Sequence, residues 1–266
     1  MIEFRQCEIA FSDSFSLKAI DWVIKRGDVR AIIGPNGSGK SALVASLAGE
    51  GRVIKGQRVI GCDNISLVSL EEQGRLIDRE KARDDSDLTD EVDRGTSVAE
   101  MLDETCVDKP LCLELVALLS LEKLLDRGFR DLSTGETRKL MLIRALCGGA
   151  ELIAFDEPFE GLDALSALKV EEVLARVSGT KTLVLAFNRF DEIPNFVSHI
   201  LYLEEGSIKH EFTSEDNLTA IKQTLSQLQN MQRDIIELPS PEISFDEMLN
   251  QDGTLVRLTD VRVAYT

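Results

Sequence analysis

The fold of this chain is decided by eight consecutive residues, Gly34-Pro35-Asn36-Gly37-Ser38-Gly39-Lys40-Ser41. They match the pattern G-x-x-x-x-G-K-[ST] and lie between a short apolar run at 29–33 and a helix-forming run that begins at 41. Glycines let the backbone wrap closely, so that successive N–H groups point at one anion. The positive N-terminus of the following helix is directed at the same charge. The stretch predicts a loop that binds the phosphates of a nucleotide, most simply ATP.

Two side chains at the end of this loop suit a metal–nucleotide complex. Lys40 offers a mobile cation for the β- and γ-phosphates, and the Ser41 hydroxyl can ligate Mg²⁺. We therefore expect ATP and Mg²⁺ as cofactors. The alternative, a glycine-rich turn with a lysine by chance, leaves the strand before the loop and the helix after it unexplained.

A second group of chemical residues follows the apolar strand LIAF at 152–155. Asp156, directly after this strand, is expected near the phosphate loop, where it holds Mg²⁺ through water. Glu157 then reaches the water that attacks the γ-phosphate, and acts as a base or orients that water. Buried strands often end in Asp, so the pair is informative only in combination with the phosphate loop.

The string LSTGE at 132–136 precedes a helix and has two interpretations. Ser133 and Glu136 form the capping box S-x-x-E, which explains the pattern structurally. Functionally, the helix N-terminus, with the Ser133 hydroxyl and the Gly135 amide, can grip the γ-phosphate of ATP held by another subunit. The two interpretations are compatible, and the position shortly before the strand that ends in two carboxylates favours adding the second.

The rest of the chain alternates between strand and helix patterns, which indicates a mostly parallel sheet. Residues 71–95 are a dense mixture of charges, and 84–93 hold six acidic residues and no basic one. We interpret 84–93 as a solvated loop, because a calcium loop would need a Gly at its turning position. Strands are expected within 2–33 and at 65–70, 152–155 and 182–187, with a final pair turning at Glu205-Gly206, and helices at 97–102, 111–125, 137–147 and 164–177.

The composition argues against several classes of function. A net charge of −17 repels phosphate backbones, so no nucleic-acid partner is expected. No apolar run approaches the roughly 20 residues that span a bilayer, and the N-terminus lacks a signal-peptide pattern. The five cysteines are scattered, and no pair has the spacing of a metal knuckle or a redox CxxC. We expect reduced thiols in a cytoplasmic protein and no cysteine metal site.

The order GPNGSGKS, LSTGE, LIAFDEP and GLD resembles the ATP-binding cassette (ABC) ATPases over roughly residues 1–210. The resemblance implies an α/β P-loop NTPase fold with a mostly parallel core sheet, an N-terminal antiparallel β part and a helical subdomain at about 71–150. The four strings correspond to the Walker A loop, the ABC signature, Walker B and the D-loop, in which Asp163 crosses to a partner. Phe11 lies where the family has an aromatic residue that stacks on adenine; the alternative is an ordinary core residue.

Three longer strings resemble one particular group within this family. LSTGETRK at 132–139, DEPFEGLD at 156–163 and NRFDEIP at 188–194 are similar to the molybdate-transport-type ATP-binding proteins, also called photorepair proteins, which carry two cassettes in tandem. The partner implied is a second cassette, either in tandem in a longer protein or in a head-to-tail homodimer of this chain. A membrane permease subunit is the further partner that such a resemblance implies.

The end of the chain is consistent with a tandem. LTDVRVAYT at 258–266 resembles the opening FRQCEIAF at 4–11 and predicts the first strand of a second copy. The alternative is a strand that completes this domain's own sheet. The expected organisation is an ATPase domain at 1–212, a helix and linker at 213–256, and the start of a truncated second cassette at 257–266.

Three positions depart from the family pattern. Asn188 stands where the family has its switch histidine, and an amide can donate a hydrogen bond to a γ-phosphate but cannot take up a proton. The expected Q-loop glutamine falls on Leu70, which leaves Gln73 as the candidate Mg²⁺ ligand of that loop. Thr134 replaces a usual glycine of the signature. Together these departures suggest slow hydrolysis or a regulatory role.

Two functions of different class follow from the sequence. One is ATP binding and hydrolysis by one cassette of an ABC-type ATPase, energising transport of molybdate or a related substrate, with peripheral contact at the inner face of the membrane. The other is a soluble nucleotide-dependent switch with slow turnover and no transported substrate. The acidic charge disfavours a ribosome-associated factor. An unrelated P-loop kinase would need neither LSTGE nor the carboxylate pair.

Overall fold

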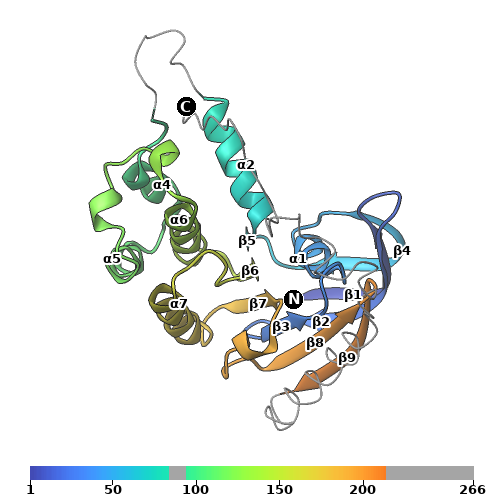
Figure 1. Cartoon of the computed structure of the whole chain (residues 1–266). Coiled ribbons are helices and arrows are strands. Elements are labelled where there is room, and N and C mark those ends of the chain that lie inside the picture. The colour runs from blue at the N-terminus through green and yellow to red at the C-terminus, as the bar shows by residue number, and fades with distance from the viewer. Residues whose placement is uncertain (84–93, 214–266) are drawn as a thin grey trace, which may run out of the picture. The chain divides into compact units, whose positions relative to one another are not determined.

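The computed structural model describes residues 1–83 and 94–213, all of which belong to one compact unit. Three sequence-based predictions lie outside these residues: the acidic loop at 84–93, the helix and linker at 213–256 apart from Thr213, and the start of a second cassette at 257–266. Within the described part, the strands form two sheets (Figure 1).

The larger sheet has six strands, and five of them are parallel. Their order is β5 (Ile65–Val68), β6 (Leu152–Asp156), β7 (Thr182–Phe187), β3 (Val29–Ile33), β8 (His199–Glu204) and β9 (Ser207–Thr213), with only β9 antiparallel to its neighbour. Every residue of β3 and β7 is buried, as expected for central strands covered on both faces. The predicted mostly parallel core sheet is confirmed.

The smaller sheet is antiparallel and comes from the N-terminal part of the chain. It joins β2 (Ser16–Ile24), β1 (Ile2–Ala10) and β4 (Arg52–Ile60) in that order. Its inner face contributes Phe4 and Trp22, whose rings stack with centroids 6.0 Å apart. Helix α1 (Lys40–Leu47) packs against β6 and β7, and its buried leucines belong to the same hydrophobic core as this inner face. That packing fixes the first turn of α1 beside the carboxyl ends of the parallel strands.

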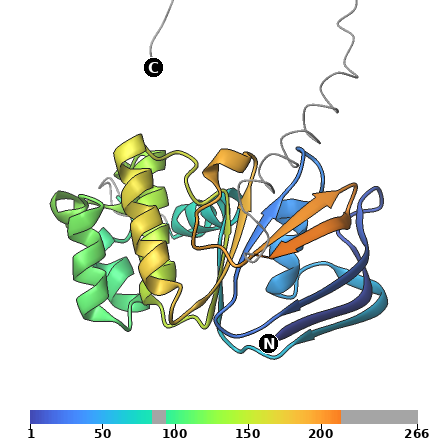
Figure 2. The ribbon, with the colours of Figure 1, turned by 90° about the horizontal axis from the view of Figure 1, so that it is seen from below.

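The remaining helices lie on the other side of the larger sheet from the three-stranded sheet, as Figures 1 and 2 both show. They are α2 (Leu70–Lys81), α4 (Val98–Thr105), α5 (Lys109–Leu118), α6 (Thr134–Cys147) and α7 (Ala164–Val177), with short 3-10 turns at Glu122–Leu124, Phe129–Asp131 and Phe190–Glu192. Helix α6 contacts α2, α4, α5 and β5, so it joins the helical part to the sheet. Among the described helices, none combines the length and the apolar character needed to cross a bilayer.

Two expected elements end earlier in the structure than the sequence indicated, each for a physical reason. The strand expected at 65–70 stops at Val68, because the Ser69 hydroxyl accepts the backbone N–H of Glu72 and starts helix α2 within the charged stretch. The helix expected at 111–125 ends at Leu118, because Ser120 has a φ of 60° and breaks the helical path.

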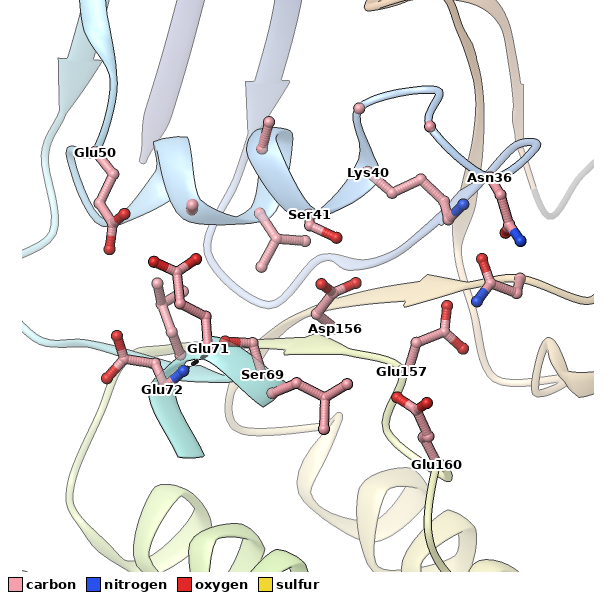
Figure 3. Close-up of a pocket in the computed structure, with 18 of the residues that line it drawn as sticks. Asn36, Lys40, Ser41, Glu50, Ser69, Glu71, Glu72, Asp156, Glu157 and Glu160 are labelled. Atoms are coloured by element: carbon pink, nitrogen blue, oxygen red, sulfur yellow. Dashed lines mark hydrogen bonds between the residues drawn. The ribbon is translucent and has the colours of Figure 1, made fainter. Parts of the chain in front are cut away.

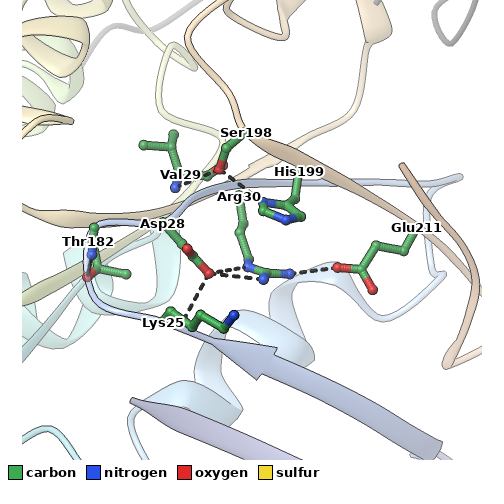
Figure 4. Close-up of polar contacts among 9 residues, drawn as sticks. Lys25, Asp28, Val29, Arg30, Thr182, Ser198, His199 and Glu211 are labelled. Atoms are coloured by element: carbon green, nitrogen blue, oxygen red, sulfur yellow. Dashed lines mark hydrogen bonds and ion pairs between the residues drawn. The ribbon is translucent and has the colours of Figure 1, made fainter. Parts of the chain in front are cut away.

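A buried cation links the central strand β3 to the edge strand β9. Arg30 on β3 is only 5% exposed and lies between Asp28, 2.9 Å away, and Glu211 of β9, 2.7 Å away (Figure 4). Its guanidinium carbon also lies 6.0 Å from the centroid of the Trp22 ring. Because both carboxylates satisfy the buried charge, Arg30 links β3, β9 and the smaller sheet without an unpaired ion.

Candidate nucleotide site

The loop at 34–41 follows β3 and has a backbone that side chains would obstruct. A Cβ at Gly34 would lie 2.0 Å from the carbonyl oxygen of Leu203 on the neighbouring strand β8. Gly37 and Gly39 have φ values of 78° and 104°, in the left-handed region that favours glycine. The three glycines therefore shape a tight backbone cradle at the carboxyl end of the strand.

Lys40 is the first residue of α1, and its side chain turns back over the loop. Its ammonium donates hydrogen bonds to the carbonyl oxygens of Gly34 at 2.9 Å and Pro35 at 3.2 Å. Burial lowers the pKa of Lys40, while the charges of Glu157 and Asp156 raise it. The cation therefore lies between the loop and the carboxylates, at a position suited to the outer phosphates of a nucleotide.

Within the described part of the chain, unpaired polar groups in the cradle indicate a ligand: the Ser38 hydroxyl and the uncapped N-terminus of α1 suit a phosphate, and the Glu157 oxygen suits a water molecule. The Ser38 hydroxyl and one carboxylate oxygen of Glu157 are buried without a hydrogen-bond partner among the described residues. No described side chain caps the N-terminus of α1, and Gly39 occupies its N-cap position. Buried polar groups are normally paired, so these groups mark where a ligand belongs.

A cavity of about 660 Å³ lies beside the loop and brings together residues from distant parts of the sequence (Figure 3). Lys40 and Ser41 line it from α1, Asp156 and Glu157 from the end of β6, and Asn188 from the end of β7. These strands are parallel, so the residues that follow them meet at one edge of the sheet. Ser41 faces Asp156 across the cavity, an arrangement of hydroxyl and carboxylate that can hold Mg²⁺.

Glu157 has an unusual backbone and an unusual charge state. Its φ of 58° is costly for a glutamate, and such strain is typical of functional positions. Burial, together with the charge of Asp156, raises the pKa of Glu157 to about 7, against the opposing effect of Lys40. A carboxyl group with this pKa is suited to exchange a proton with water near neutral pH.

Arg138, in the second turn of α6, holds the backbone at this position. Its guanidinium donates to the carbonyl oxygens of Asp156 at 2.7 Å and Glu157 at 2.6 Å, and its side chain is only 1% exposed. Arg138 lies in the string LSTGETRK at 132–139, but no local sequence signal indicates this long-range contact. The contact joins the helix that begins with LSTGE to the two carboxylates.

The signature residues do not line this cavity. Ser133, Gly135 and Glu136 lie at the N-terminus of α6, where the predicted capping box is present: the Ser133 hydroxyl accepts the Glu136 N–H, and the Glu136 carboxylate accepts the Ser133 N–H at 2.7 Å. A Cβ on Gly135 would lie 3.1 Å from the Gly161 carbonyl oxygen, so the signature lies beside the predicted D-loop. A phosphate gripped by Ser133 would therefore belong to a different nucleotide from the one at the loop.

Two further predicted residues lie away from the cavity. Gln73 is buried on α2 and lines a separate cavity of about 220 Å³ beside Thr134. Helix α2 starts at Leu70 and turns Glu71 and Glu72 toward the phosphate loop instead. Phe11 and Phe15 both pack against the core; Phe11 lies near Gly51, and Phe15 also lines the cavity. The stacking of Phe11 on adenine stays a prediction.

Several cavity residues were missed from the sequence. They are Glu50, Glu71, Glu72 and Glu160, and Arg75 pairs with the first three. A signal for part of this set was present, because Ser69–Glu72 reads S-x-x-E, the same helix-start pattern that predicted the cap at Ser133.

Comparison with known proteins places the chain in a family. Residues 17–160 match the ABC transporter family model, and the chain belongs to this family of ATP-binding cassette ATPases. It is 37% identical to the ABC transporter ATP-binding protein ModF of Escherichia coli over 246 residues, which cover 91% of this chain and 50% of ModF. It is 32% identical to the aliphatic sulfonates import ATP-binding protein SsuB of Corynebacterium glutamicum, covering 74% of this chain and 77% of SsuB. The chain thus spans about half the length of ModF.

Solved structures agree on the fold. The ATP-binding subunit of an ABC transporter superposes with a TM-score of 0.67 at 17% identity, covering 88% of this chain and 98% of that one. A dimeric ATP-binding cassette in a post-hydrolysis state, bound to ADP and Pi, superposes with a TM-score of 0.58 at 19% identity, covering 80% and 99%. The predicted P-loop NTPase fold of the ABC type is confirmed.

Proposed function

We propose that this chain binds Mg-ATP in the cavity beside its phosphate loop and hydrolyses it in a site completed by a second cassette. One observation supports this most directly: Lys40, Ser41, Asp156, Glu157 and Asn188 come from three separate elements and line one cavity. This is the set that a phosphate loop, a metal and an attacking water require.

Each side chain has a chemical task in the proposal. The loop amides and the Lys40 ammonium would hold the phosphates, and the Ser41 hydroxyl with Asp156 would hold Mg²⁺, whose charge would stabilise the developing phosphate charge. Glu157 orients the attacking water and accepts its proton. Asn188 donates a hydrogen bond to the γ-phosphate but provides no titratable group. We expect this last difference to slow turnover, because a neutral amide cannot share the proton.

We infer the need for a second cassette from the position of the signature residues. Ser133 and Gly135 are outside the cavity that their own chain offers. A phosphate that needs both the loop and a signature must therefore lie between two cassettes. We propose residues 1–212 as one such cassette, with its partner either in tandem beyond the linker at 213–256 or supplied by a second copy of the chain.

The relatives favour a role in transport. ModF and SsuB are named as an ABC transporter ATP-binding protein and an import ATP-binding protein, and similarity to them favours an energy-coupling cassette over the regulatory switch considered above. We propose that closure of two cassettes over ATP moves a membrane permease, which would place the chain at the inner face of a membrane. Molybdate is the cargo proposed from the sequence resemblance alone.

The test combines nucleotide binding with the concentration dependence of hydrolysis. ATP binding is measured by calorimetry with Mg²⁺ for the wild-type chain, for Lys40→Ala, and for Lys55→Ala as a control on an exposed strand position. We expect Lys40→Ala to lose binding by at least 100-fold and the control to retain it. The ATPase rate per molecule should rise with protein concentration. A large rate per molecule that is independent of concentration contradicts the shared site, and equal ATP affinity in both variants contradicts the loop assignment.

A further inference from the structure

Three cysteines meet inside the helical part of the molecule. Cys106, Cys112 and Cys147 are 3%, 6% and 0% exposed, and their sulfur atoms all lie within 4.8 Å of one another. They come from three elements: Cys106 caps the end of α4, Cys112 lies near the start of α5, and Cys147 is the last residue of α6. The nucleotide cavity and its lining use none of them.

Backbone hydrogen bonds fix the three element ends around this point. The carbonyl oxygen of Cys147 accepts the N–H groups of Val107 at 2.9 Å and Asp108 at 3.2 Å, which attaches the α4–α5 connection to the end of α6. Cys106 N–H closes the last turn of α4 on Leu102 at 2.8 Å. The sulfur atoms are therefore held close by the packing of three helices and not by one flexible loop.

The spacing of the sulfur atoms fits a three-coordinate metal ion. A trigonal ion bonded to sulfur at about 2.3 Å needs its ligand atoms about 4.0 Å apart, which is within the span of this cluster. Thiolates are soft ligands and select Cu(I), zinc and related thiophilic ions over Mg²⁺ or Ca²⁺. A closed set of sulfur ligands with little water access is typical of a structural site or a site for metal capture.

The surroundings act differently on the three thiols. Hydrogen bonding from the Cys147 thiol lowers the pKa of Cys106, and the charges of Lys109 and Arg144 act in the same direction. Burial raises the pKa of Cys112, and hydrogen bonding with Cys106 together with burial raises that of Cys147, so a metal ion has to displace protons from these two thiols. Lys109 is in turn paired with Asp103 at 2.6 Å, and Arg144 donates to the Thr105 hydroxyl at 3.0 Å. Two cations near three sulfur atoms reduce the repulsion that three neighbouring thiolates would otherwise suffer.

We propose that Cys106, Cys112 and Cys147 form a binding site for one soft, thiophilic metal ion, separate from the nucleotide site. A disulfide is the competing use of such thiols, but it would join two of the sulfur atoms and leave the third, equally buried one, without a role. The bound ion would fasten the ends of α4, α5 and α6 to one another. Since α6 begins at the signature, the site ties that helix to the helical part from its opposite end.

The experiment titrates the reduced full chain with Cd²⁺, and separately with Cu(I) against a chromophoric competitor. Thiolate-to-metal charge-transfer absorption reports sulfur coordination, and its saturation gives the stoichiometry. Single variants Cys106→Ser, Cys112→Ser and Cys147→Ser each remove one ligand with little change in volume. Cys62→Ser, at the partly buried cysteine outside the cluster, is the matched control.

We expect one equivalent of metal per chain, an affinity loss of at least about 100-fold in each cluster variant, and no change in the control. Circular dichroism checks that each variant folds. For any that does not, alkylation of the wild-type chain with and without Cd²⁺, mapped by mass spectrometry, shows whether metal protects these three thiols. The proposal is overturned if the reduced chain takes up no metal, if the cluster variants bind as the wild type does, or if only a Cys–Cys crosslink forms.

Discussion

Glu157→Gln tests the charge state at the centre of the nucleotide site through folding stability, without nucleotide or magnesium. The folded chain raises the pKa of Glu157 from 4.5 to about 7, chiefly by burial. Between these two values the folded state keeps the proton that the unfolded state has lost, so stability falls as pH rises. Glutamine is close in shape and never ionises, so the variant lacks this cost.

The size of the effect follows from the size of the shift. A rise in the pKa from 4.5 to about 7 destabilises the folded state by about 3.4 kcal/mol at high pH, at about 1.36 kcal/mol per pKa unit. The side chain is only partly buried, and solvent screening reduces the figure. About 40% of the cost is already present near pH 5.5, so we expect the variant to gain about 1 kcal/mol more stability near pH 8.5 than near pH 5.5.

Urea unfolding of wild type and variant at both pH values measures this difference through the transition midpoints. Glu160→Gln is the matched control, since Glu160 lines the same cavity but is exposed, and its variant should change stability by less than about 0.5 kcal/mol at either pH. A gain for Glu157→Gln that is equal at both pH values, or larger in acid, refutes the assigned charge state. An equal pH-dependent gain in the control would show that general charge repulsion is responsible.

Two further substitutions test residues that hold the backbone of the nucleotide site in place. Gly34→Ala places a Cβ about 2.0 Å from the Leu203 carbonyl oxygen, so we expect a loss of at least about 2 kcal/mol in urea unfolding, and an unchanged midpoint would show that the loop yields easily. Arg138→Met keeps the bulk of the side chain but removes both hydrogen bonds to the carbonyls of Asp156 and Glu157, and we expect ATP turnover to fall at least about tenfold while ATP affinity changes less than about threefold. Parallel losses in affinity and turnover would instead indicate a general structural role for Arg138.

Local sequence signals were sufficient for the elements that build the nucleotide cavity. TLVLAF and, apart from Arg30, VRAII are mostly apolar because their strands are buried on both faces, and the glycine pattern between 34 and 41 favours a tight loop. The capping box at Ser133 and Glu136 uses only neighbouring residues, so it too could be predicted. To predict that Asp156 and Glu157 lie near the phosphate loop, one further rule was needed: neighbouring parallel strands have their carboxyl ends at the same edge of the sheet.

What could not be predicted depends on contacts between distant segments. Phe11 and Phe15 are both in the turn after β1, and only the packed structure shows which one faces the cavity. The cysteines at 106, 112 and 147 have no knuckle spacing, and they meet because α6 returns to the α4–α5 connection. The expectation that no cysteine metal site exists rested on spacing alone, and the three-thiol cluster shows the limit of that argument.

The hydrogen bonds of Lys40 to its own loop bear on how tightly a nucleotide can be held. The ammonium already donates to two acceptors, the carbonyl oxygens of Gly34 and Pro35, which leaves one of its three N–H groups for a phosphate. A second contact with the phosphate has to replace one of these internal bonds, each worth on the order of 1 kcal/mol. The internal bonds also hold the cation over the loop before a nucleotide arrives, so less side-chain freedom is lost when the ligand binds.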